Sequence, residues 1–532
     1  MRNNRSRIFY YFALPVLLLA AYAVQPSLAN AETSLGVDCA KIDVASLMMQ
    51  DNMRAGLILI QCGIVKGGQP SAGGATKLPA PPNIRASNRA CSSSTSCTKS
   101  ESMVWASTKN KGKTIVANFN DSKGDGSDYS GTAYSSDGGA TFHEIEPPPL
   151  GSSSHGENFG DPLVVFNSKL GKFFAGDIVG GGDCGSDGLG LWSSSDGIHW
   201  AAVSCPHVGT GDDRPSMWVD NNPTSKHYGR MYVSWNDFAN NGALSVVYSD
   251  NGTSWTGPVI LNSGTFIRDV QITGAPRGAK LVGTSSAVFV AGMDEGGGAN
   301  NTRQNLMYRS TNGGATWTSV IMGPRFNPPG DSSCATNTYF WQVNPIIRHM
   351  GWGQPAVGPS GVVHYVYAGH GTGNDTGDIF YQRSTDNGKT WSKAIKLNTD
   401  PDAQFKEQWM PSLSATSEGN ITASWYDRRK ATSACNSVGD KGCNYERVGR
   451  QSKTNGASWL ASVTISTAII PQPAQDDPTV QQCYAGDYDY STALNAADSA
   501  APGFAYVTWT DGRRLVGGVH VQDVDFAKVP EP

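Results

Sequence analysis

Charged residues are scarce in this chain: Asp, Glu, Lys and Arg make up only 16% of its 532 residues. So little charge, together with 9% aromatic residues, excludes an intrinsically disordered chain. No apolar run beyond the N-terminus approaches the ~18 residues of a membrane-spanning helix, so we expect no membrane span. The net charge of -4 lacks the basic excess of nucleic-acid-binding proteins, which argues against a nucleic-acid partner.

Common cofactor and nucleophile motifs are absent as well. The sequence has no C-x-x-C pair, no phosphate-binding loop, no G-x-S-x-G turn and no EF-hand pattern. We therefore expect neither a cofactor nor a catalytic metal. A structural calcium ion remains an alternative, because acid-rich loops such as residues 211–213 offer carboxylate oxygens as ligands.

The N-terminus has the pattern of an export signal. Arginines precede an apolar stretch over residues 12–24, and an A-x-A cleavage site ends at Ala31. We predict that residues 1–31 are a signal peptide and that the mature protein is secreted or periplasmic after cleavage near Ala31.

All ten cysteines follow this signal, and an even number in an exported chain indicates disulfides. Pairing sequence neighbours predicts four bridges, and elimination leaves a fifth. The predicted pairs are Cys39–Cys62, Cys91–Cys97, Cys184–Cys205, Cys435–Cys443 and Cys334–Cys483.

The first of these bridges encloses a small unit. Apolar residues within 32–66 recur at helical spacing, which predicts a disulfide-tied helical segment that docks on the main body. Residues 67–82 (GGQPSAGGATKLPAPP) form a Gly/Pro linker.

One motif, S-x-D-x-G-x-T-W, recurs along residues 83–532. It is complete at 384–391, and the copy at 248–255 keeps Asp250 at the Asp position. The Asp can accept backbone N–H groups in a hairpin turn, the Gly supplies a positive φ, and the aromatic residue packs beneath the turn. The six copies begin at Ser135, Ser194, Tyr248, Ser310, Ser384 and Ser452.

This motif resembles the Asp box (BNR repeat) of sialidase-like β-propellers of the exported bacterial type. The resemblance covers residues 83–532 and implies an all-β fold with four-stranded antiparallel blades. Two further repeats, one at the start of each first strand and one at the end of each second strand, occur seven times. We therefore predict a seven-bladed β-propeller, with six blades as the alternative, in which residues 83–86 supply the last outer strand and close the ring.

Strands alternate in direction within a blade, so first-strand starts and second-strand ends share one face, the funnel mouth. The turn motifs lie on the opposite face. Polar residues gather at the funnel mouth. Pairs of acids there could catalyse glycoside hydrolysis, and arginines there could bind an anionic sugar. The predicted catalytic residues are Asp121, Asp161, Glu407, Asp487 and Tyr488, and the predicted substrate-binding residues are Arg85, Arg214, Arg268, His370 and Arg428.

The sialidase resemblance implies three arginines around a sugar carboxylate, a Tyr nucleophile with a Glu partner, and an Asp acid/base. Arg85 stands where the family's R-I-P motif has its arginine. Arg214, Arg268 and Arg348 are candidates for the rest of the set, and Tyr488 is the candidate nucleophile. A structural alternative applies to the arginines after Asp427 and Asp511, which can instead form salt bridges with those acids.

Three functions fit this pattern. The first is an exported glycan-active enzyme, a glycoside hydrolase with sialidase-like chemistry, with paired carboxyls in a deep pocket. The second is a non-catalytic propeller that binds glycan or protein, with a plugged funnel and its acids in salt bridges. The third is a polysaccharide lyase on uronic-acid glycans, with a His–Tyr pair beside an arginine. In each case we expect a monomer whose partner is a carbohydrate or glycoconjugate.

Overall fold

The computed structural model describes residues 33–71, 83–123, 126, 128–145, 154–330, 332–334, 336–344, 347–403, 405–433, 442–498 and 503–532. The predicted signal peptide, residues 72–82 of the predicted linker and Cys435 of the predicted Cys435–Cys443 bridge lie outside these ranges. The other four predicted disulfides are confirmed. Within the described ranges, no helix is long and apolar enough to cross a membrane.

Nearly all regular structure in these ranges is β, in seven mostly antiparallel sheets of four to six strands and two smaller ones. Sheet 1 holds β2 (Thr98–Ala106), β3 (Ile115–Ser122), β4 (Ser130–Ser135), β5 (His143–Glu144) and β32 (Asp489–Tyr490). Sheet 2 holds β6 (Gly156–Asn158), β7 (Leu163–Asn167), β8 (Lys172–Gly181), β9 (Gly185–Ser194), β10 (Ala201–His207) and β11 (Gly209–Thr210). Sheet 3 holds β12 (Asp212–Val219), β13 (Met231–Asp237), β14 (Ala243–Ser249) and β15 (Thr256–Asn262).

Sheet 4 holds β16 (Ile267–Arg268), β17 (Ile272–Gly274), β18 (Val288–Asp294), β19 (Gln304–Ser310) and β20 (Thr318–Ile321). Sheet 5 holds β24 (Gln354–Val357), β25 (Val363–Gly369), β26 (Asp378–Ser384) and β27 (Ile395–Lys396). Sheet 6 holds β28 (Gln408–Ala415), β29 (Ile421–Asp427), β30 (Glu446–Ser452) and β31 (Val463–Thr464). Sheet 7 holds β33 (Thr492–Leu494), β34 (Phe504–Asp511), β37 (Asp523–Pro530) and β1 (Ile84–Arg85).

The short elements lie between these sheets. One small sheet holds β21 (Ser332–Ser333), β22 (Trp341–Asn344) and β23 (Ile347–Arg348), and a hairpin holds β35 (Leu515–Val516) and β36 (Val519–His520). The helices are α1 (Val44–Met49) and α2 (Met53–Gln61), with 3-10 turns η2 (Ser94–Ser96), η3 (Phe238–Asn240) and η4 (Ala496–Asp498).

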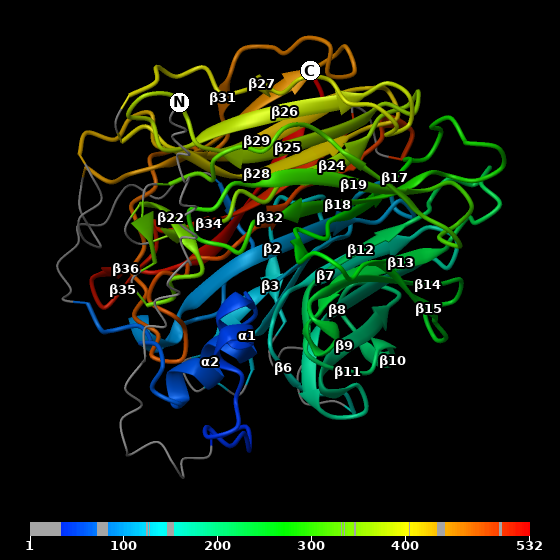
Figure 1. Cartoon of the computed structure of the whole chain (residues 1–532). Coiled ribbons are helices and arrows are strands. Elements are labelled where there is room, and N and C mark those ends of the chain that lie inside the picture. Colours follow the sequence, from blue (N-terminus) through cyan, green and yellow to red (C-terminus); the bar gives the residue numbers. More distant parts are fainter. Residues whose placement is uncertain are drawn as a thin grey trace, which may run out of the picture.

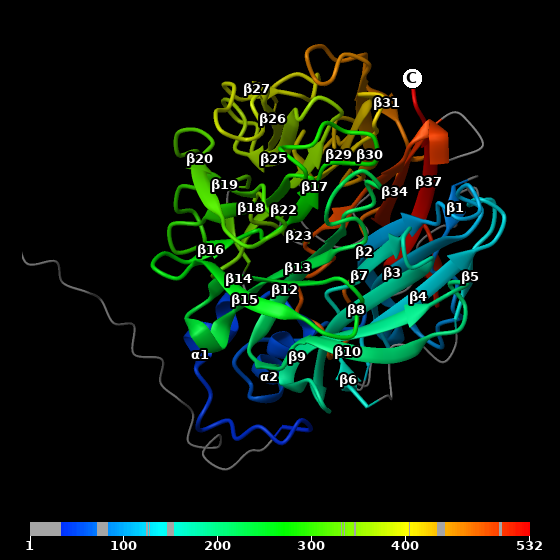
Figure 2. The same ribbon diagram turned by 90° about the vertical axis from the view of Figure 1, so that its right-hand side faces the viewer.

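The first strands of the seven sheets contact one another in chain order. They are β2, β7, β12, β17, β24, β28 and β33, and β33 contacts β2 again. Figures 1 and 2 accordingly show blue β2 beside red β34, although they lie at opposite ends of the chain. We call these strands the inner strands.

Residues 83–86 supply the outer strand of sheet 7, as the sequence predicts. Ile84 pairs with Phe526, and Arg85 pairs with Asp525, in antiparallel register. The sheet therefore combines the first strand after the linker with the last strand of the chain. An edge strand covered in this way exposes fewer unpaired backbone groups.

The register places the two kinds of repeat at opposite ends of the sheets. In sheet 1, Lys99 near the start of β2 faces Asp121 near the end of β3. At the other end, Ile115 faces Ser135, which opens the first turn motif. First-strand starts and second-strand ends therefore share one face, as predicted.

The turn motifs are bonded as their residue types predict. Asp386 accepts the N–H groups of Lys389 and Thr390 at 3.0 and 2.9 Å, and the Thr390 hydroxyl donates to it at 2.7 Å. Gly388 has a φ of +78°. The acid is thus a turn-forming group on the face opposite the funnel mouth.

For the copy at 248–255, the prediction that Asp250 holds the acceptor position is wrong. Asn251 accepts the N–H groups of Thr253 and Ser254 at 2.9 and 3.0 Å, whereas Asp250 pairs with Arg230 at 2.7 Å. The motif is one residue shorter here, since it begins at the serine after Tyr248, and the acceptor therefore moves by one position.

The helical segment is closed by its own disulfide and docks on sheets 1 to 3. Asn52 caps α2 by accepting the N–H of Ala55 at 2.8 Å. Met53 and Leu57 are at most 4% exposed and join an apolar core with side chains from these sheets. Figures 1 and 2 both show α2 close to β6.

We expect Asp386→Ala to lower the free energy of unfolding by about 1–2 kcal/mol, because four donors lose their acceptor. Urea denaturation measures the loss. Asp250→Ala is the matched control and should cost under about 1 kcal/mol, because it breaks only a surface ion pair. Equal losses of unfolding free energy in the two variants would show that the turn hydrogen bonds do not stabilise the fold.

Candidate functional site

Three buried arginines reach one aspartate at the end of the molecule where the inner strands begin. Arg214 lies in β12, Arg268 in β16 and Arg348 in β23, and each is at most 2% exposed. The Asp51 carboxylate accepts Arg268 Nη2 at 2.6 Å and Arg214 Nη1 at 3.1 Å. The Asp51 carbonyl oxygen accepts Arg348 Nη2 at 2.9 Å. We call these four residues the arginine clasp.

Other acids complete the neutralisation of the arginines. Arg268 Nη1 donates to Asp213 at 2.7 Å, and Arg348 Nε donates to Asp487 at 3.0 Å. Burying an unpaired guanidinium costs several kcal/mol, whereas a second carboxylate offsets much of that penalty. The clasp is therefore one network that joins the helical segment to sheets 3 and 4 and to the strand-start residue Asp487.

Aromatic rings line the clasp. The guanidinium carbon of Arg214 lies 3.8 Å from the centroid of Trp352 and 4.7 Å from that of Tyr488. Arg348 lies 4.0 Å from the Phe340 centroid. The negative ring faces attract the cations and exclude water from them, which strengthens every charge interaction in the site.

The first strands begin with unusual backbone. A bulge occurs at Glu101, Arg214 and Met410, where the register shifts by one residue or more. Non-glycine residues with positive φ are uncommon and strained by about 1–3 kcal/mol, and they cluster at functional sites. A bulge also re-aims the side chain of the extra residue. The strand-start residues with positive φ are Glu101 (43°), Asp161 (60°), Arg214 (51°), Asp269 (77°) and Met410 (44°).

The charge state of Asp51 follows from its neighbours. Burial alone would raise its pKa, but the charges of Arg268 and Arg214 outweigh burial and hold the pKa at about 2. Asp51 is therefore fully ionised at neutral pH, which is the state that the arginines bind.

Two nearby carboxyls behave in the opposite way. Burial raises the pKa of Asp161 well above its usual range, and the charges of Asp51 and Asp213 raise it further. Burial, followed by the charge of Asp161, likewise raises the pKa of Glu101. Both groups thus favour the protonated form beside an ionised carboxylate, the arrangement that acid–base chemistry needs.

Three of the five predicted catalytic residues surround the clasp. Asp161 accepts the backbone N–H of Arg214 at 2.8 Å, and Asp487 pairs with Arg348. The Tyr488 ring stacks on Tyr490 at 4.6 Å. Within the described part of the chain, the Tyr488 hydroxyl and Asp161 Oδ1 are buried without a hydrogen-bond partner.

The other two predicted catalytic residues lie in separate ion pairs. Asp121 is fully buried and contacts Arg89 at 2.6 Å. Glu407 contacts Arg428 at 2.7 Å, so the predicted substrate-binding residue Arg428 has an acid as its partner. Both of these predicted catalytic acids, one at a second-strand end and one at a first-strand start, are therefore neutralised by arginines outside the clasp.

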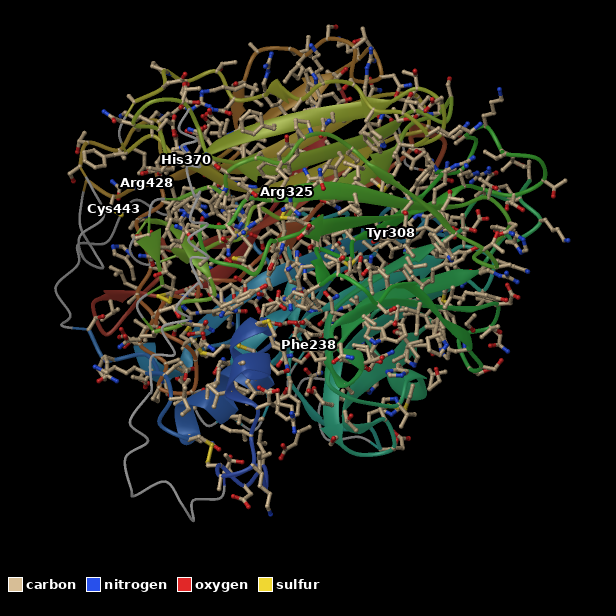
Figure 3. All side chains as sticks on the ribbon, in the orientation of Figure 1. Phe238, Tyr308, Arg325, His370, Arg428 and Cys443 are labelled. Carbon is tan, nitrogen blue, oxygen red and sulfur yellow. A yellow bond between two sulfur atoms is a disulfide. The ribbon has the colours of Figure 1, made fainter. Side chains whose placement is uncertain are left out.

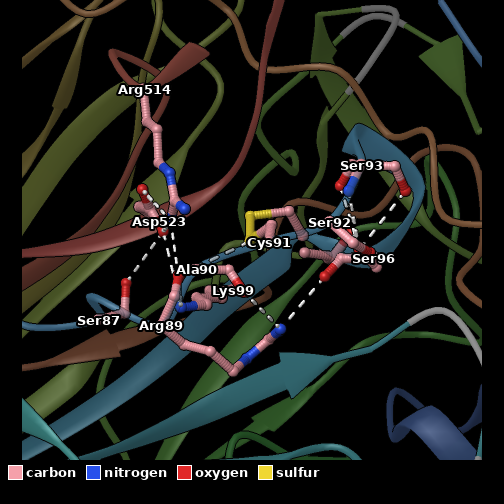
Figure 4. The surroundings of a disulfide bond; sticks show 12 residues. Ser87, Arg89, Ala90, Cys91, Ser92, Ser93, Ser96, Lys99, Arg514 and Asp523 are labelled. Atoms are coloured by element: carbon pink, nitrogen blue, oxygen red, sulfur yellow. Dashed lines mark hydrogen bonds and ion pairs between the residues drawn. A yellow bond between two sulfur atoms is a disulfide. The ribbon is translucent and has the colours of Figure 1, made fainter. Parts of the chain in front are cut away.

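Of the remaining predicted substrate-binding residues, Arg214 and Arg268 belong to the clasp and Arg85 does not. Arg85 lies in β1 at the outer edge of sheet 7 and contacts Asp523 at 3.2 Å. Figure 4 shows Arg514 reaching the same carboxylate, at 3.2 Å, next to the Cys91–Cys97 disulfide. The third arginine of the clasp is Arg348, which binds the Asp51 carbonyl oxygen and the Asp487 carboxylate.

His370 follows β25 and borders a separate cavity of about 520 Å³. Figure 3 shows His370 and Arg428 well apart from Phe238, whose ring centroid lies 5.4 Å from the Arg268 guanidinium. The cavity walls are largely aromatic and include Phe326, Tyr367, Phe380 and Trp391.

The structural alternative for the arginines after strand ends holds for Arg429 and Arg513, whereas Arg428 and Arg514 pair with other acids. Arg429 pairs with Asp427 and Arg513 with Asp511, each at 2.6 Å. Each pair joins residues two apart and fixes a loop.

Asp51 is the clasp residue that the repeat pattern does not identify. It lies in a two-helix segment outside the repeats, where an acid before a helix is usually a solvent-facing cap residue. A short polar sequence, Gln50-Asp51-Asn52, within an otherwise apolar stretch is the only signal.

Three carboxylates of the site are close enough to share a cation. Oxygens of Asp51, Asp161 and Asp213 lie within 4.8 Å of one another. The cations that contact Asp51 and Asp213 in this structure are the guanidinium groups of Arg214 and Arg268. A structural calcium ion stays a prediction.

A channel of about 130 Å³ lies between the inner strands. Tyr490 connects it to the clasp, because its ring lines the channel while its hydroxyl accepts Arg214 Nη2 at 2.7 Å. The channel walls also carry Trp105, Trp218, Gln271, Gln354 and Asn495.

The sequence matches no family model, and no curated protein matches it. Among solved structures, a PL25 ulvan lyase is similar over 82% of this chain and 95% of its own, with 12% identity and a TM-score of 0.44. The Penicillium chrysogenum α-L-arabinanase covers 85% and 98%, at 14% identity and a TM-score of 0.38. The Hadza microbial sialidase Hz136 covers 82% and 66%, at 12% identity and a TM-score of 0.36. With TM-scores below 0.5, the function has to be argued from the side chains of this chain.

We expect Asp51→Asn to lower the free energy of unfolding by roughly 2–4 kcal/mol at pH 7, because the buried Arg214 and Arg268 lose an ionised partner. The folded-state pKa of about 2 lies below the ordinary 3.8, so this stabilisation is present above pH 3.8 and disappears as the pH falls through 2. Urea titrations of both proteins between pH 7 and 2 measure it.

Asp43→Asn is the matched control. Asp43 caps α1 by accepting the N–H of Ser46 at 3.0 Å, and Asn is an equally good cap. A gap between wild type and Asp51→Asn that does not close at low pH would contradict the assigned charge state.

Proposed function

We propose that this chain is an exported, monomeric, seven-bladed β-propeller that acts on glycans, and that the clasp arginines hold the carboxylate of an acidic sugar. The seven sheets and the circular contacts of their inner strands support the propeller. The main support for the site is that two buried arginines, Arg214 and Arg268, already bind a carboxylate, while Arg348 binds the carbonyl oxygen of the same residue.

Arginine suits this role because its planar donors match a carboxylate in fixed geometry. In the clasp, Arg268 and Arg214 contact different oxygens of the Asp51 carboxylate. The aromatic walls formed by Trp352 and Tyr488 exclude water, so a sugar carboxylate would gain more there than at the surface.

The residues beside the clasp suit glycoside hydrolysis. Asp161, whose raised pKa favours the protonated form, would donate a proton to the leaving oxygen. Tyr488 would attack the sugar once a neighbouring carboxylate accepts its proton. Burial, together with the charges of Asp161 and Glu101, raises the pKa of Tyr488 well above its usual value, so this transfer requires a base in contact with it.

A non-catalytic binding propeller is the second candidate, and it is favoured by the burial of the acids. Asp121 and Glu407 are in ion pairs, and α2 covers the funnel. These are the features that a plugged funnel is expected to have. On this alternative, ligands would bind without turnover.

The lyase alternative has less support. A buried His364–Tyr381 pair at 2.6 Å has Arg383 nearby. Its histidine also bonds Asn455 of the sixth turn motif at 3.0 Å, on the face opposite the clasp. Burial lowers the pKa of His364 to about 3, which suits a packing role better than a base.

The test uses the full chain carrying Asp51→Ala, which vacates the clasp. Sialosides and uronic-acid polymers are compared with the same glycans after reduction of their carboxyl groups. We expect binding or release of sugar with the acidic forms and at least tenfold less with the reduced forms, because each charge-assisted bond adds ~1.5–3 kcal/mol. Glycan arrays and product chromatography measure both.

Arginine variants supply the controls. Adding Arg348→Gln to Asp51→Ala should weaken binding at least tenfold, whereas Arg325→Ala, whose residue pairs with Asp294 outside the clasp, should not. Equal binding of acidic and reduced glycans would exclude the proposed function. Binding without turnover would favour the second candidate.

A further inference from the structure

The helical segment occupies the clasp as a bound ligand would. We propose that residues 33–66 are a removable self-ligand, in which the Asp51 side chain stands in for the carboxylate of an external molecule. While the Asp51 side chain occupies the clasp, the site cannot bind an outside carboxylate. The inference rests on the proposed function only for the identity of that outside molecule.

The contacts of the segment centre on one short peptide. Besides the three arginine bonds to Asp51, the side-chain nitrogen of Asn52 donates to Asp213 at 2.7 Å, and its backbone N–H donates to the same acid at 3.2 Å. Arg54 pairs with Asp187 at 3.3 Å. Polar recognition thus concentrates at the start of α2, at the mouth of the site.

The apolar side of α2 supplies most of the docking energy. Met53, Leu57, Ile58 and Leu59 are at most 4% exposed. Burying several such side chains strongly favours the docked state, so a severed segment would stay bound for long periods. The clasp then determines which ligand occupies the site, and the apolar face determines how slowly the segment leaves.

No described disulfide joins the segment to the sheets. Cys39–Cys62 closes within the segment itself and ties α1 to α2. In the sequence, the Gly/Pro linker of residues 67–82 is the single covalent connection to the rest of the chain. One cut in this linker would therefore release a disulfide-bonded unit that keeps its shape.

A permanent plug would not need a charged clasp. Replacing a buried ion network by apolar residues is often neutral or stabilising, so stability alone does not explain three buried arginines. The segment also leaves polar groups of the site unused. Asp161 Oδ1 and the Tyr488 hydroxyl, both buried beside the clasp, have no hydrogen-bond partner among the described residues. A ligand with more polar groups than one aspartate side chain would satisfy them.

Chemical rescue tests the self-ligand in the full chain. Asp51→Ala leaves the clasp without a carboxylate, so free acetate should rebind there and raise the melting temperature by several degrees at about 100 mM. Chloride at equal ionic strength should not, and neither wild type nor Asp43→Ala should respond to acetate. An acetate response no larger than the chloride response would overturn the inference.

A second measurement follows the segment itself. A site-specific protease sequence is placed within residues 72–82, the purified chain is cut, and gel filtration reports the retained segment. We expect the wild-type segment to stay bound and the Asp51→Asn segment to dissociate at least tenfold faster, with Asp43→Asn unchanged. Glucuronic and N-acetylneuraminic acids should accelerate release, whereas glucose should not.

The outcomes separate the two proposals. Acetate rescue and Asp51-dependent release, without any response to acidic sugars, would retain the self-ligand and refute the proposed function. Two results would refute the self-ligand and identify residues 33–66 as a permanent structural part. One is a release rate that does not depend on Asp51. The other is loss of the folded sheets upon release, measured by circular dichroism.

Discussion

The contact on which the rest of the site depends is the ion pair network around the Asp51 carboxylate. Arg214, Arg268 and Arg348 come from distant parts of the chain and are fully removed from water. Guanidinium groups in that position require an ionised partner, which Asp51 supplies to Arg214 and Arg268 and Asp487 supplies to Arg348. Its bonds therefore hold the helical segment, the inner strand starts and the aromatic walls in one arrangement.

Charge is not balanced one to one around this contact. Asp161 and Asp213 lie beside the same arginines as Asp51, and burial and mutual repulsion raise the pKa values of these two acids and of Glu101. The site thereby combines one ionised carboxylate, Asp51, with acids whose pKa values are raised, a combination that is typical of catalytic sites.

The repeats in the sequence predict which strand-start residues lie close together in the site. Asp161, Arg214 and Asp487 occupy the same place in their units, and a shared strand start predicts that they converge. The repeat specifies a backbone position and not the partner of a side chain, so Glu407 occupies an equivalent place yet pairs with Arg428. The turn-motif acids were predictable because their partners are local.

The other contacts of the site could not be predicted, because they join residues whose partners no repeat specifies. Asp51 and Arg214 are 163 residues apart, and only tertiary packing brings them together. Arg348 lies in a short irregular sheet between units, where no motif fixes its direction. The shift from Asp250 to Asn251 came from one missing residue in a turn, which alignment by the tryptophan alone conceals.

A double-mutant cycle between Asp51 and Arg268 tests the central claim most directly. Asp51→Asn, Arg268→Gln and the double variant are unfolded in urea, and the coupling free energy is taken from the four proteins. The account predicts a coupling of at least about 2 kcal/mol, as expected for a buried, directly bonded charge pair. Losses that add to within about 0.5 kcal/mol would contradict it, because independent effects would mean that the clasp does not hold the segment.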